Sequence, residues 1–342
     1  MAFTPKQELQ NGKYIIDRSL NQGRFGVSYL AHNKQNQRVV IKTFKDDIWQ
    51  NLSDTDKEKT NNRLMREYSG LSKCNHPHIV KFDRSFLEQG QLCLVMEYID
   101  GQDLDSLSQP ILPVDTALEY IRQIGSALKV VHGQGLVHRD VKPANIMLRS
   151  GKPEVVLIDF GLAGGSDETI TMNTSTRESG FAALELYDAN EKAQPYTDVY
   201  GLGATLYTLL SGQNLLAAPD RSKVGKDKLP SLPQSVNDRI YQAIEKAVEL
   251  DWEKRLQTVD EFLALLEPSE VETQGVSPPE PAPDLQKLAF EETRRQTRFT
   301  VYGVCVGVAG ILVAILLGLF GQELKSFLIS PFSQPVPEQK SK

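Results

Sequence analysis

Cysteine is scarce in this sequence. Only three cysteines occur among 342 residues, Cys74, Cys93 and Cys305, and they show no paired spacing. Such usage argues against a disulfide scaffold and suits a reducing compartment. The first ten residues also lack the apolar core of a secretory signal peptide, so no secretory signal is expected there.

Positive charge is not in excess either. Lysine and arginine together number 38 against 44 aspartates and glutamates, which gives a net charge of −6. No basic stripe interleaved with aromatic residues appears, so the sequence predicts no nucleic-acid partner. With 40% hydrophobic and 24% charged residues, the chain has the composition of a soluble globular protein. Its length suits one domain of roughly 250 residues with extensions.

Two nearby histidines lack the surroundings of a metal site. His76 and His78 are expected to point to opposite sides of an extended segment, because alternate residues of such a segment face opposite ways. No thiol or carboxylate stands near them at ligand spacing. Metal binding by this pair is therefore not expected.

Residues 137–146, VHRDVKPANI, together with the DFG sequence that begins at Asp159, are the most informative part of the chain. Asp140, Lys142 and Asn145 place a carboxylate, an ammonium and a carboxamide on one loop, and the DFG sequence adds a second carboxylate on the next strand. Phosphoryl transfer from ATP needs one acid that accepts a hydroxyl proton, two oxygen ligands for Mg²⁺ and a cation near the γ-phosphate. The run resembles the catalytic loop and metal-binding turn of the eukaryotic-type (Hanks-type) serine/threonine protein kinases.

This resemblance implies an α+β, bilobal protein-kinase fold over residues 13–267, with a small β-rich N-lobe and a larger helical C-lobe. It implies that Asp140 accepts the proton of the acceptor hydroxyl and that Lys142 neutralises charge on the transferred group. Asn145 and Asp159 would hold Mg²⁺. A lysine two residues after the catalytic aspartate is the serine/threonine form of this loop.

Residues upstream of the loop extend the resemblance. The run VVIK at residues 39–42 matches the third strand of the family, which assigns Lys42 to the α- and β-phosphates of ATP. Apolar residues recur at helical spacing around Glu67 and predict a packed helix. By position, Glu67 is the residue that holds Lys42 in place. The polar sequence between the two is interpreted as a solvated loop.

A glycine-containing run resembles the loop that covers the ATP phosphates. Gly23 and Gly26 have no Cβ, so backbone N–H groups near them can approach phosphate oxygens closely. Asn21 stands in place of the family's first glycine, and Ser28 stands in place of a valine. Asparagine tolerates a positive φ better than other non-glycine residues do, so the loop is expected to keep its shape.

Residues 94–101 resemble the hinge that joins the two lobes. By this resemblance Met96 gates the adenine pocket, and the backbones of Glu97 and Ile99 read the adenine edge. Asp103 falls where an acidic residue meets the ribose. The full set of implied nucleotide-binding residues is Leu20, Asn21, Gly23, Phe25, Gly26, Ser28, Lys42, Met96, Glu97, Ile99, Asp103 and Met147.

Residues 162–176 occupy the position of the activation segment, and Arg139 of the catalytic loop is expected to meet a phosphate there. Autophosphorylation is expected among Thr169, Thr171, Thr174, Ser175 and Thr176. Two departures from the family follow. Glu178 replaces a threonine near the catalytic aspartate, and Leu184 replaces the proline of the Ala-Pro-Glu motif. These changes make the peptide-docking region atypical.

Other residues of the larger lobe are expected to be architectural. Glu185 is predicted to form a buried ion pair with Arg255. Asp198, at the start of a long apolar helix, is expected to hydrogen-bond the catalytic-loop backbone. Two amphipathic helices are expected around residues 236–249 and 258–266.

The sequence beyond the predicted domain indicates a membrane anchor. Residues 268–298 are rich in proline and end in basic residues, which predicts an extended juxtamembrane linker; a recruited PxxP ligand is the less favoured interpretation. Residues 299–321 carry no charge and are long enough to cross a hydrocarbon core of about 30 Å as one C-terminal transmembrane helix. A buried core helix is the alternative, but the completed domain and the linker leave nothing obvious for it to pack against.

Charges beside the predicted span give its orientation. Arg294, Arg295 and Arg298 precede it, and only Lys325 lies close after it. The positive-inside rule then places the kinase domain in the cytoplasm, on a single-pass protein of the plasma (cell) membrane. Residues 322–342 would form a short extracytoplasmic tail.

The predicted membrane span also contains a motif that can support dimerisation. Gly303 and Gly307 form a GxxxG pair in the predicted span, and such small-residue stripes can pack membrane helices together. The expected partners are therefore protein substrates, the membrane and, as a further option, a second copy of the protein that binds through this helix or through the kinase domain.

The sequence is best interpreted as a membrane-anchored serine/threonine protein kinase that uses ATP and Mg²⁺, acts on proteins in signalling and most resembles bacterial members. The alternative is a catalytically weak pseudokinase scaffold at the membrane. Only the departures at Asn21, Glu178 and Leu184 support that alternative, because every chemical group required for transfer is present.

Overall fold

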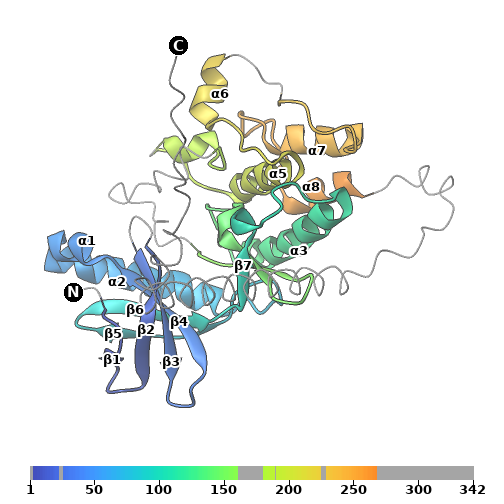
Figure 1. Ribbon diagram of the computed structural model, residues 1–342. Coiled ribbons are helices and arrows are strands. Elements are labelled where there is room, and N and C mark those ends of the chain that lie inside the picture. Colours follow the sequence, from blue (N-terminus) through green and yellow to red (C-terminus); the bar gives the residue numbers. More distant parts are fainter. Residues whose placement is uncertain (1–2, 23–25, 161–179, 189, 225–228, 268–342) are drawn as a thin grey trace, which may run out of the picture. The chain divides into compact units, whose positions relative to one another are not determined.

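The computed structural model describes residues 3–22, 26–160, 180–188, 190–224 and 229–267. All of them belong to one unit, which extends from Met1 to Gln274. Within it, a smaller lobe built on a sheet and a larger lobe built on helices can be distinguished (Figure 1). The predicted α+β, bilobal architecture is confirmed over these residues.

A six-stranded antiparallel sheet forms the smaller lobe, in the order β1-β2-β3-β4-β6-β5. Short turns join β3 to β4 and β5 to β6, and Asn36 and Gly90 in these turns have φ values of 59° and 79°. Glycine and asparagine adopt this left-handed region at low cost. The strands are β1 (Glu8–Leu9), β2 (Tyr14–Gln22), β3 (Gly26–Asn33), β4 (Arg38–Phe44), β5 (Phe82–Glu88) and β6 (Gln91–Glu97).

Helix α2 (Asp54–Leu71) packs on one face of this sheet. It begins after Ser53, whose hydroxyl accepts the backbone N–H of Asp56 at 3.1 Å and so satisfies one free donor of the first turn. Its apolar side, which includes Leu64 and Leu71, is buried. The packed helix predicted around Glu67 is therefore confirmed.

A short helix, α1 (Asp46–Asn51), precedes α2. Its Trp49 is buried and stacks on Phe44 with ring centroids 5.6 Å apart. The expectation of a solvated loop between Lys42 and α2 was wrong. A six-residue helix with a polar composition is not stable by its helix propensity alone, and the buried contact of Trp49 stabilises it.

The opposite face of the sheet is covered by residues that precede β2. Phe3 and Leu9 are buried there, in a second apolar core formed with alternate residues of the strands. The ring of Phe3 lies 5.3 Å from that of Tyr29, and its backbone N–H donates to the Tyr29 hydroxyl at 3.2 Å. Gln10 donates its N–H to the Glu88 carboxylate at 3.0 Å, which ties this segment to β5. The expected domain start at residue 13 omits this part of the lobe.

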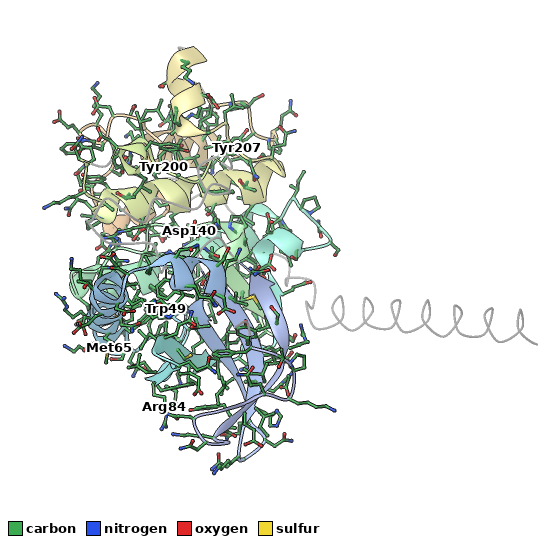
Figure 2. All side chains as sticks on the ribbon, turned by 90° about the vertical axis from the view of Figure 1, so that its left-hand side faces the viewer. Trp49, Met65, Arg84, Asp140, Tyr200 and Tyr207 are labelled. Carbon is green, nitrogen blue, oxygen red and sulfur yellow. The ribbon has the colours of Figure 1, made fainter. Side chains whose placement is uncertain are left out.

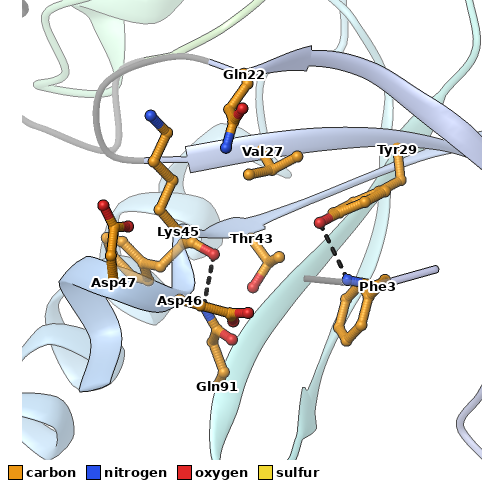
Figure 3. A pocket seen from close by; sticks show the side chains of 10 residues that line it. Phe3, Gln22, Val27, Tyr29, Thr43, Lys45, Asp46, Asp47 and Gln91 are labelled. Atoms are coloured by element: carbon orange, nitrogen blue, oxygen red, sulfur yellow. Dashed lines mark hydrogen bonds between the residues drawn. The ribbon is translucent and has the colours of Figure 1, made fainter. Parts of the chain in front are cut away.

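A cavity of about 230 Å³ lies beside this second core, between Phe3 and the start of α1 (Figure 3). Three polar side chains on its wall already have partners. Tyr29 binds the N–H of Phe3, Thr43 donates to a strand carbonyl at 2.9 Å, and Gln91 donates to the Phe44 carbonyl at 2.7 Å. These bonds fix the wall of the cavity.

Helices form the larger lobe. Its elements are η1 (Leu104–Ser106), α3 (Val114–Gly133), η2 (Pro143–Asn145), η3 (Leu184–Tyr187), α5 (Pro195–Ser211), α6 (Ala218–Val224), α7 (Asp238–Ala247) and α8 (Val259–Leu266). Helix α5 is buried along most of its length, and Figure 2 shows its Tyr200 and Tyr207 inside this lobe. A Cβ at Gly203 would lie 2.6 Å from that of Ala247, so glycine permits the close packing of α5 on α7. The predicted apolar helix and both amphipathic helices are confirmed.

In the larger lobe, a small antiparallel sheet that packs on α3 connects the hinge to the catalytic loop. It consists of β7 (Gly101–Asp103), β8 (Ile146–Arg149) and β9 (Val155–Leu157). The N–H of Val80, from the chain after α2, donates to the Leu157 carbonyl at 3.0 Å. This contact joins the end of β9 to the segment that leads into β5.

Several predicted features lie outside the described residues. They include the predicted span at 299–321 with its flanking segments, and the activation-segment residues 162–176 with Glu178. Within the described ranges, no helix combines the length and the apolar character that a membrane crossing requires.

Candidate active site

Two polar residues of the catalytic loop, Lys142 and Asn145, contact the carboxylate of a third, Asp140. The Nζ of Lys142 lies 2.9 Å from Oδ1 of Asp140, and Nδ2 of Asn145 donates to Oδ2 at 2.8 Å. Asn145 also donates to the Asp140 carbonyl at 2.8 Å, through the turn that Pro143 begins. The Asp140 side chain is 21% exposed, so an acceptor hydroxyl can reach it. Figure 2 shows Asp140 where the two lobes meet.

A buried aspartate on α5 holds the backbone of this loop. Asp198 accepts the N–H groups of His138 at 2.8 Å and Arg139 at 2.7 Å. It also contacts Nε2 of His132 at 2.8 Å. Arg139 has a φ of 69°, a left-handed conformation that is uncommon for a non-glycine residue and that these bonds help to hold. The predicted role of Asp198 is confirmed, whereas the contact of His132 was not predicted.

His138 connects the catalytic loop to the DFG sequence. Its Nε2 donates to the Ile158 carbonyl at 3.0 Å, and its Nδ1 accepts the N–H of Asp140 at 3.3 Å. Both contacts fit one neutral tautomer, and burial lowers the pKa of His138, which favours that form. The ring packs on Phe160 with centroids 4.6 Å apart, and Phe160 meets Phe82 of β5 at 6.3 Å. His138 is therefore a structural residue that fixes the position of the chain before Phe160.

Asp159 and Lys42 meet across the two lobes. Asp159 has a φ of 62°, and its carboxylate forms an ion pair with Nζ of Lys42 on β4. Burial lowers the pKa of the Lys42 ammonium to about 8, while the carboxylate of Asp140 acts in the opposite direction. Nearby negative groups therefore favour the charged form of Lys42.

The partner predicted for Lys42 is only partly described. Glu67 belongs to α2, but its side chain lies outside the described part of the structure, so its pairing with Lys42 stays a prediction. Gly23 and Phe25 also lie outside it. Of the other loop residues, Leu20 is half-buried on β2 and Gly26 is buried at the start of β3.

The two departures in the glycine-containing loop lie opposite each other. Asn21 on β2 pairs with Ser28 on β3, and Ser28 pairs with Lys42 on the next strand. A register shift between Ser19 and Asn21 precedes this pair. Both unusual residues therefore belong to one local arrangement of the hairpin, and the sheet keeps Lys42 beside it.

The predicted adenine-site residues lie on β6, the hinge and the small sheet. Met96 and Ile99 are buried, and Met147 on β8 pairs with Asp103 on β7. The Asp103 carboxylate accepts the N–H of Ser106 at 2.8 Å and its hydroxyl at 2.9 Å, which caps η1. The roles of these residues toward a nucleotide remain predictions.

The oxygen donors beside Asp140 suit Mg²⁺ carried by a triphosphate. Asn145 uses its amide nitrogen for both of its hydrogen bonds, which leaves its carbonyl oxygen for a cation. Asp159 adds a carboxylate that is 36% exposed. Mg²⁺ typically takes one or two protein oxygens together with waters and substrate phosphates. Over the described residues, no group of three or more His, Cys, Asp or Glu side chains could hold a metal ion.

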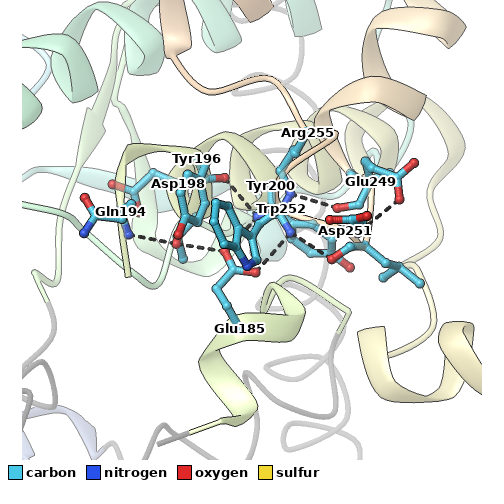
Figure 4. Close-up of polar contacts among 12 residues, drawn as sticks. Glu185, Gln194, Tyr196, Asp198, Tyr200, Glu249, Asp251, Trp252 and Arg255 are labelled. Atoms are coloured by element: carbon cyan, nitrogen blue, oxygen red, sulfur yellow. Dashed lines mark hydrogen bonds and ion pairs between the residues drawn. The ribbon is translucent and has the colours of Figure 1, made fainter. Parts of the chain in front are cut away.

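A buried ion pair supports the chain after the activation segment (Figure 4). Arg255 donates from Nη1 and Nη2 to the two carboxylate oxygens of Glu185, at 2.7 and 3.0 Å. Thr197 donates to the same carboxylate at 2.9 Å, and Nε of Arg255 donates to the Glu249 carbonyl at 2.8 Å. Both charged side chains are 1% exposed or less. The predicted pairing is confirmed, and Leu184 beside it begins η3 and packs against the core.

The prediction for the histidine pair was wrong in one respect. The rings of His76 and His78 lie side by side with centroids 5.4 Å apart, because the chain turns at Pro77 and His78 and is not extended there. Nδ1 of His78 lies 2.7 Å from the Val155 carbonyl. Burial, and then the neighbouring His78, lower the pKa of His76.

Comparison with known proteins identifies the family to which this chain belongs. The sequence model described as protein kinase domain matches residues 14–268, more than half of the chain. The chain belongs to the protein kinase domain family. The serine/threonine-protein kinase PkaA of Streptomyces coelicolor is 33% identical over 69% of this chain and 46% of its own length. The serine/threonine-protein kinase Pkn3 of Myxococcus xanthus is 31% identical over 69% of this chain and 45% of its own.

The same kinase architecture recurs among solved structures. The structure titled PpkA-294, apo form, covers 78% of this chain and 99% of its own, with a TM-score of 0.63 and 26% identity. By contrast, this kinase-family chain spans about half the length of the two relatives just named. The likeness is therefore one of the kinase domain.

Proposed function

We propose that this protein is a membrane-anchored serine/threonine protein kinase that transfers the γ-phosphate of ATP to serine or threonine hydroxyls of protein substrates in signalling. The arrangement around Asp140 carries the proposal. Lys142 and Asn145 contact its carboxylate. The ion pair of Lys42 with Asp159 joins the smaller lobe to the larger lobe near this loop. The names of PkaA and Pkn3, both serine/threonine kinases, support the same activity.

Each residue of this set has one task in the transfer. Asp140, held by Lys142 and Asn145 in one orientation, takes the proton of the acceptor hydroxyl. The hydroxyl oxygen forms its bond to the γ-phosphorus as the bond to the leaving ADP oxygen breaks, and Lys142 balances the charge of the transferred group. Lys42 positions the α- and β-phosphates. Mg²⁺, held by Asn145 and Asp159, would neutralise phosphate oxygens.

Regulation by autophosphorylation is part of the proposal. Nε of Arg139 is buried, and it has no hydrogen-bond partner among the described residues. A buried guanidinium nitrogen without a partner is costly, and a phosphate group would satisfy it. This observation supports phosphate binding at Arg139, with the threonines and the serine of residues 169–176 as the expected acceptors.

A radioactive-phosphate transfer assay tests the activity. The full-length protein with Mg-ATP should label a protein substrate or itself, while Lys42→Met should lose the labelling because it lacks the buried ammonium. Mass spectrometry of the same incubation should find phosphate within residues 169–176. No transfer by the unchanged protein would favour the pseudokinase alternative. A fully active enzyme with an unmodified segment would remove autophosphorylation from the proposal.

Membrane anchoring rests on the sequence of residues 299–321 and on the arginines before it. Protease applied to intact cells without a wall should reach only the tail beyond residue 322. The protein should also stay in the membrane fraction during carbonate extraction. Digestion of the kinase domain from outside would reverse the orientation, and extraction of the full-length protein would exclude the span.

A further inference from the structure

An ion pair crosses the hinge from the smaller lobe to the larger one. The first residues of the predicted hinge, 94–97, form the end of β6, so the hinge itself runs from Glu97, the last residue of β6, to Gly101, the first of β7. The backbone N–H of Glu97 donates to the Lys81 carbonyl at 2.9 Å, which fastens this end to the smaller lobe. Its side chain reaches the other way: Oε1 accepts Nη2 of Arg149, on β8 of the larger lobe, at 2.8 Å.

The other end of the hinge has the reverse arrangement. The carbonyl of Asp100 accepts the N–H of Ser150 at 2.8 Å, which fastens it to the larger lobe. Its carboxylate accepts Nη2 of Arg38, the first residue of β4 in the smaller lobe, at 3.2 Å. The Arg38 guanidinium also lies 4.4 Å from the centre of the Tyr98 ring. Each end of the hinge therefore forms a backbone hydrogen bond with its own lobe and a side-chain ion pair with the opposite lobe.

The pair at Glu97 is the stronger of these two contacts. Its side chains are 24% and 27% exposed, whereas those of Arg38 and Asp100 are 51% and 68% exposed. Exposed pairs contribute little because water and salt screen them. In addition, Oε2 of Glu97 is buried and has no hydrogen-bond partner among the described residues. Without Arg149 the carboxylate would lose its remaining partner, and movement of the hinge toward water would relieve that cost.

We propose that the Glu97–Arg149 ion pair is a brace that restrains opening of the lobes and slows the departure of ADP. The inference rests on the proposed function, because the adenine of ADP is expected to bind the backbones of Glu97 and Ile99. Lid and lobe opening limits product release in many enzymes that close over a substrate. Arg149 is then a positioning residue, which acts on the nucleotide through the hinge.

Arg149→Gln in the full-length protein is the test. Dissociation of a fluorescent ADP analogue, followed by stopped flow, should become about two- to fivefold faster, the range expected for a partly exposed ion pair. The KM for ATP should rise by a similar factor while kcat does not fall, because the groups around Asp140 are unchanged. A merely structural role would lower kcat and thermal stability together.

Two further variants make the result specific. Arg84→Gln removes an arginine of the edge strand β5 (Figure 2), which pairs with its neighbour Asp83, and it should leave ADP release unchanged. The double exchange Glu97→Arg with Arg149→Glu recreates the pair with reversed charges. It should return the ADP dissociation rate toward that of the unchanged protein. The brace would be overturned if the charge-reversed double variant released ADP as fast as Arg149→Gln does. It would also be overturned if Arg84→Gln accelerated ADP release equally.

Hydrogen exchange without nucleotide separates this inference from the proposed function. Arg149→Gln should speed exchange at the N–H groups of Glu97 and Ser150, which anchor the two ends of the hinge. Faster exchange in a protein that binds no ADP would support restraint of the lobes and count against the kinase proposal. Unchanged exchange and unchanged ADP release would overturn the brace while leaving kinase activity to its own assay.

Discussion

Replacing Asp140 with asparagine is expected to lower kcat for phosphate transfer by about 10²–10⁴-fold, the usual contribution of a positioned general base. The carboxamide keeps the size of the side chain and can still meet Asn145, but it cannot take a proton at neutral pH. Asp140 is partly exposed, so the folded state should lose little stability. Phosphate transfer and thermal unfolding, measured on the same full-length preparation, check both parts of the expectation.

A matched control replaces an aspartate by asparagine in another part of the protein. Asp115→Asn changes an exposed carboxylate in the first turn of α3, away from the catalytic loop. Its phosphate transfer should equal that of the unchanged protein, with a stability change below about 1 kcal/mol from the helix dipole. Near-normal turnover by Asp140→Asn would show that another group accepts the proton.

Replacing Arg255 with methionine should cost about 3–5 kcal/mol of unfolding free energy, because it leaves Glu185 buried without its bidentate partner. Both side chains are almost fully inaccessible to water, so solvent cannot take over the lost contacts. Urea unfolding followed by tryptophan fluorescence suits the measurement. Trp252 stacks on Tyr196 with ring centroids 5.2 Å apart, directly beside the pair (Figure 4).

Two further variants show where that cost comes from. Lys254→Met removes the neighbouring charge, whose side chain is 74% exposed, and should change the unfolding free energy by less than about 1 kcal/mol. Glu185→Met combined with Arg255→Met should be more stable than Arg255→Met alone, because no charge is then left unpaired. A double variant as unstable as the single one would mean that packing, rather than the buried charge, carries the effect.

The sequence predicts the grouping of polar residues around Asp140 well because these residues are local. Asp140, Lys142 and Asn145 stand close together in the chain, and Pro143 fixes the turn between them, so their contacts follow from one short loop. The pair of Glu185 with Arg255 is different. Nothing in the local sequence links these two residues, and only the resemblance to a family predicts their contact.

Contacts that depend on three-dimensional packing could not be predicted in this way. His132 reaches Asp198, and Phe82 meets Phe160, only because helices and strands far apart in sequence lie together. Helix α1 has a polar composition and forms around the buried Trp49. Periodicity carries no signal for a helix this short, because one turn of helix is unstable without its tertiary contact.

The segment before β2 has a practical consequence. A protein trimmed to the family match at residues 14–268 would lack Phe3, Leu9 and strand β1. The first residues of β2, 14–16, would then lose their pairing partners and present unpaired N–H and C=O groups beside an uncovered apolar surface. Such an edge is a template for pairing with another chain. The shortened protein should therefore self-associate through β2, and an oligomer found with it would reflect the missing residues 1–13 rather than a property of the intact molecule.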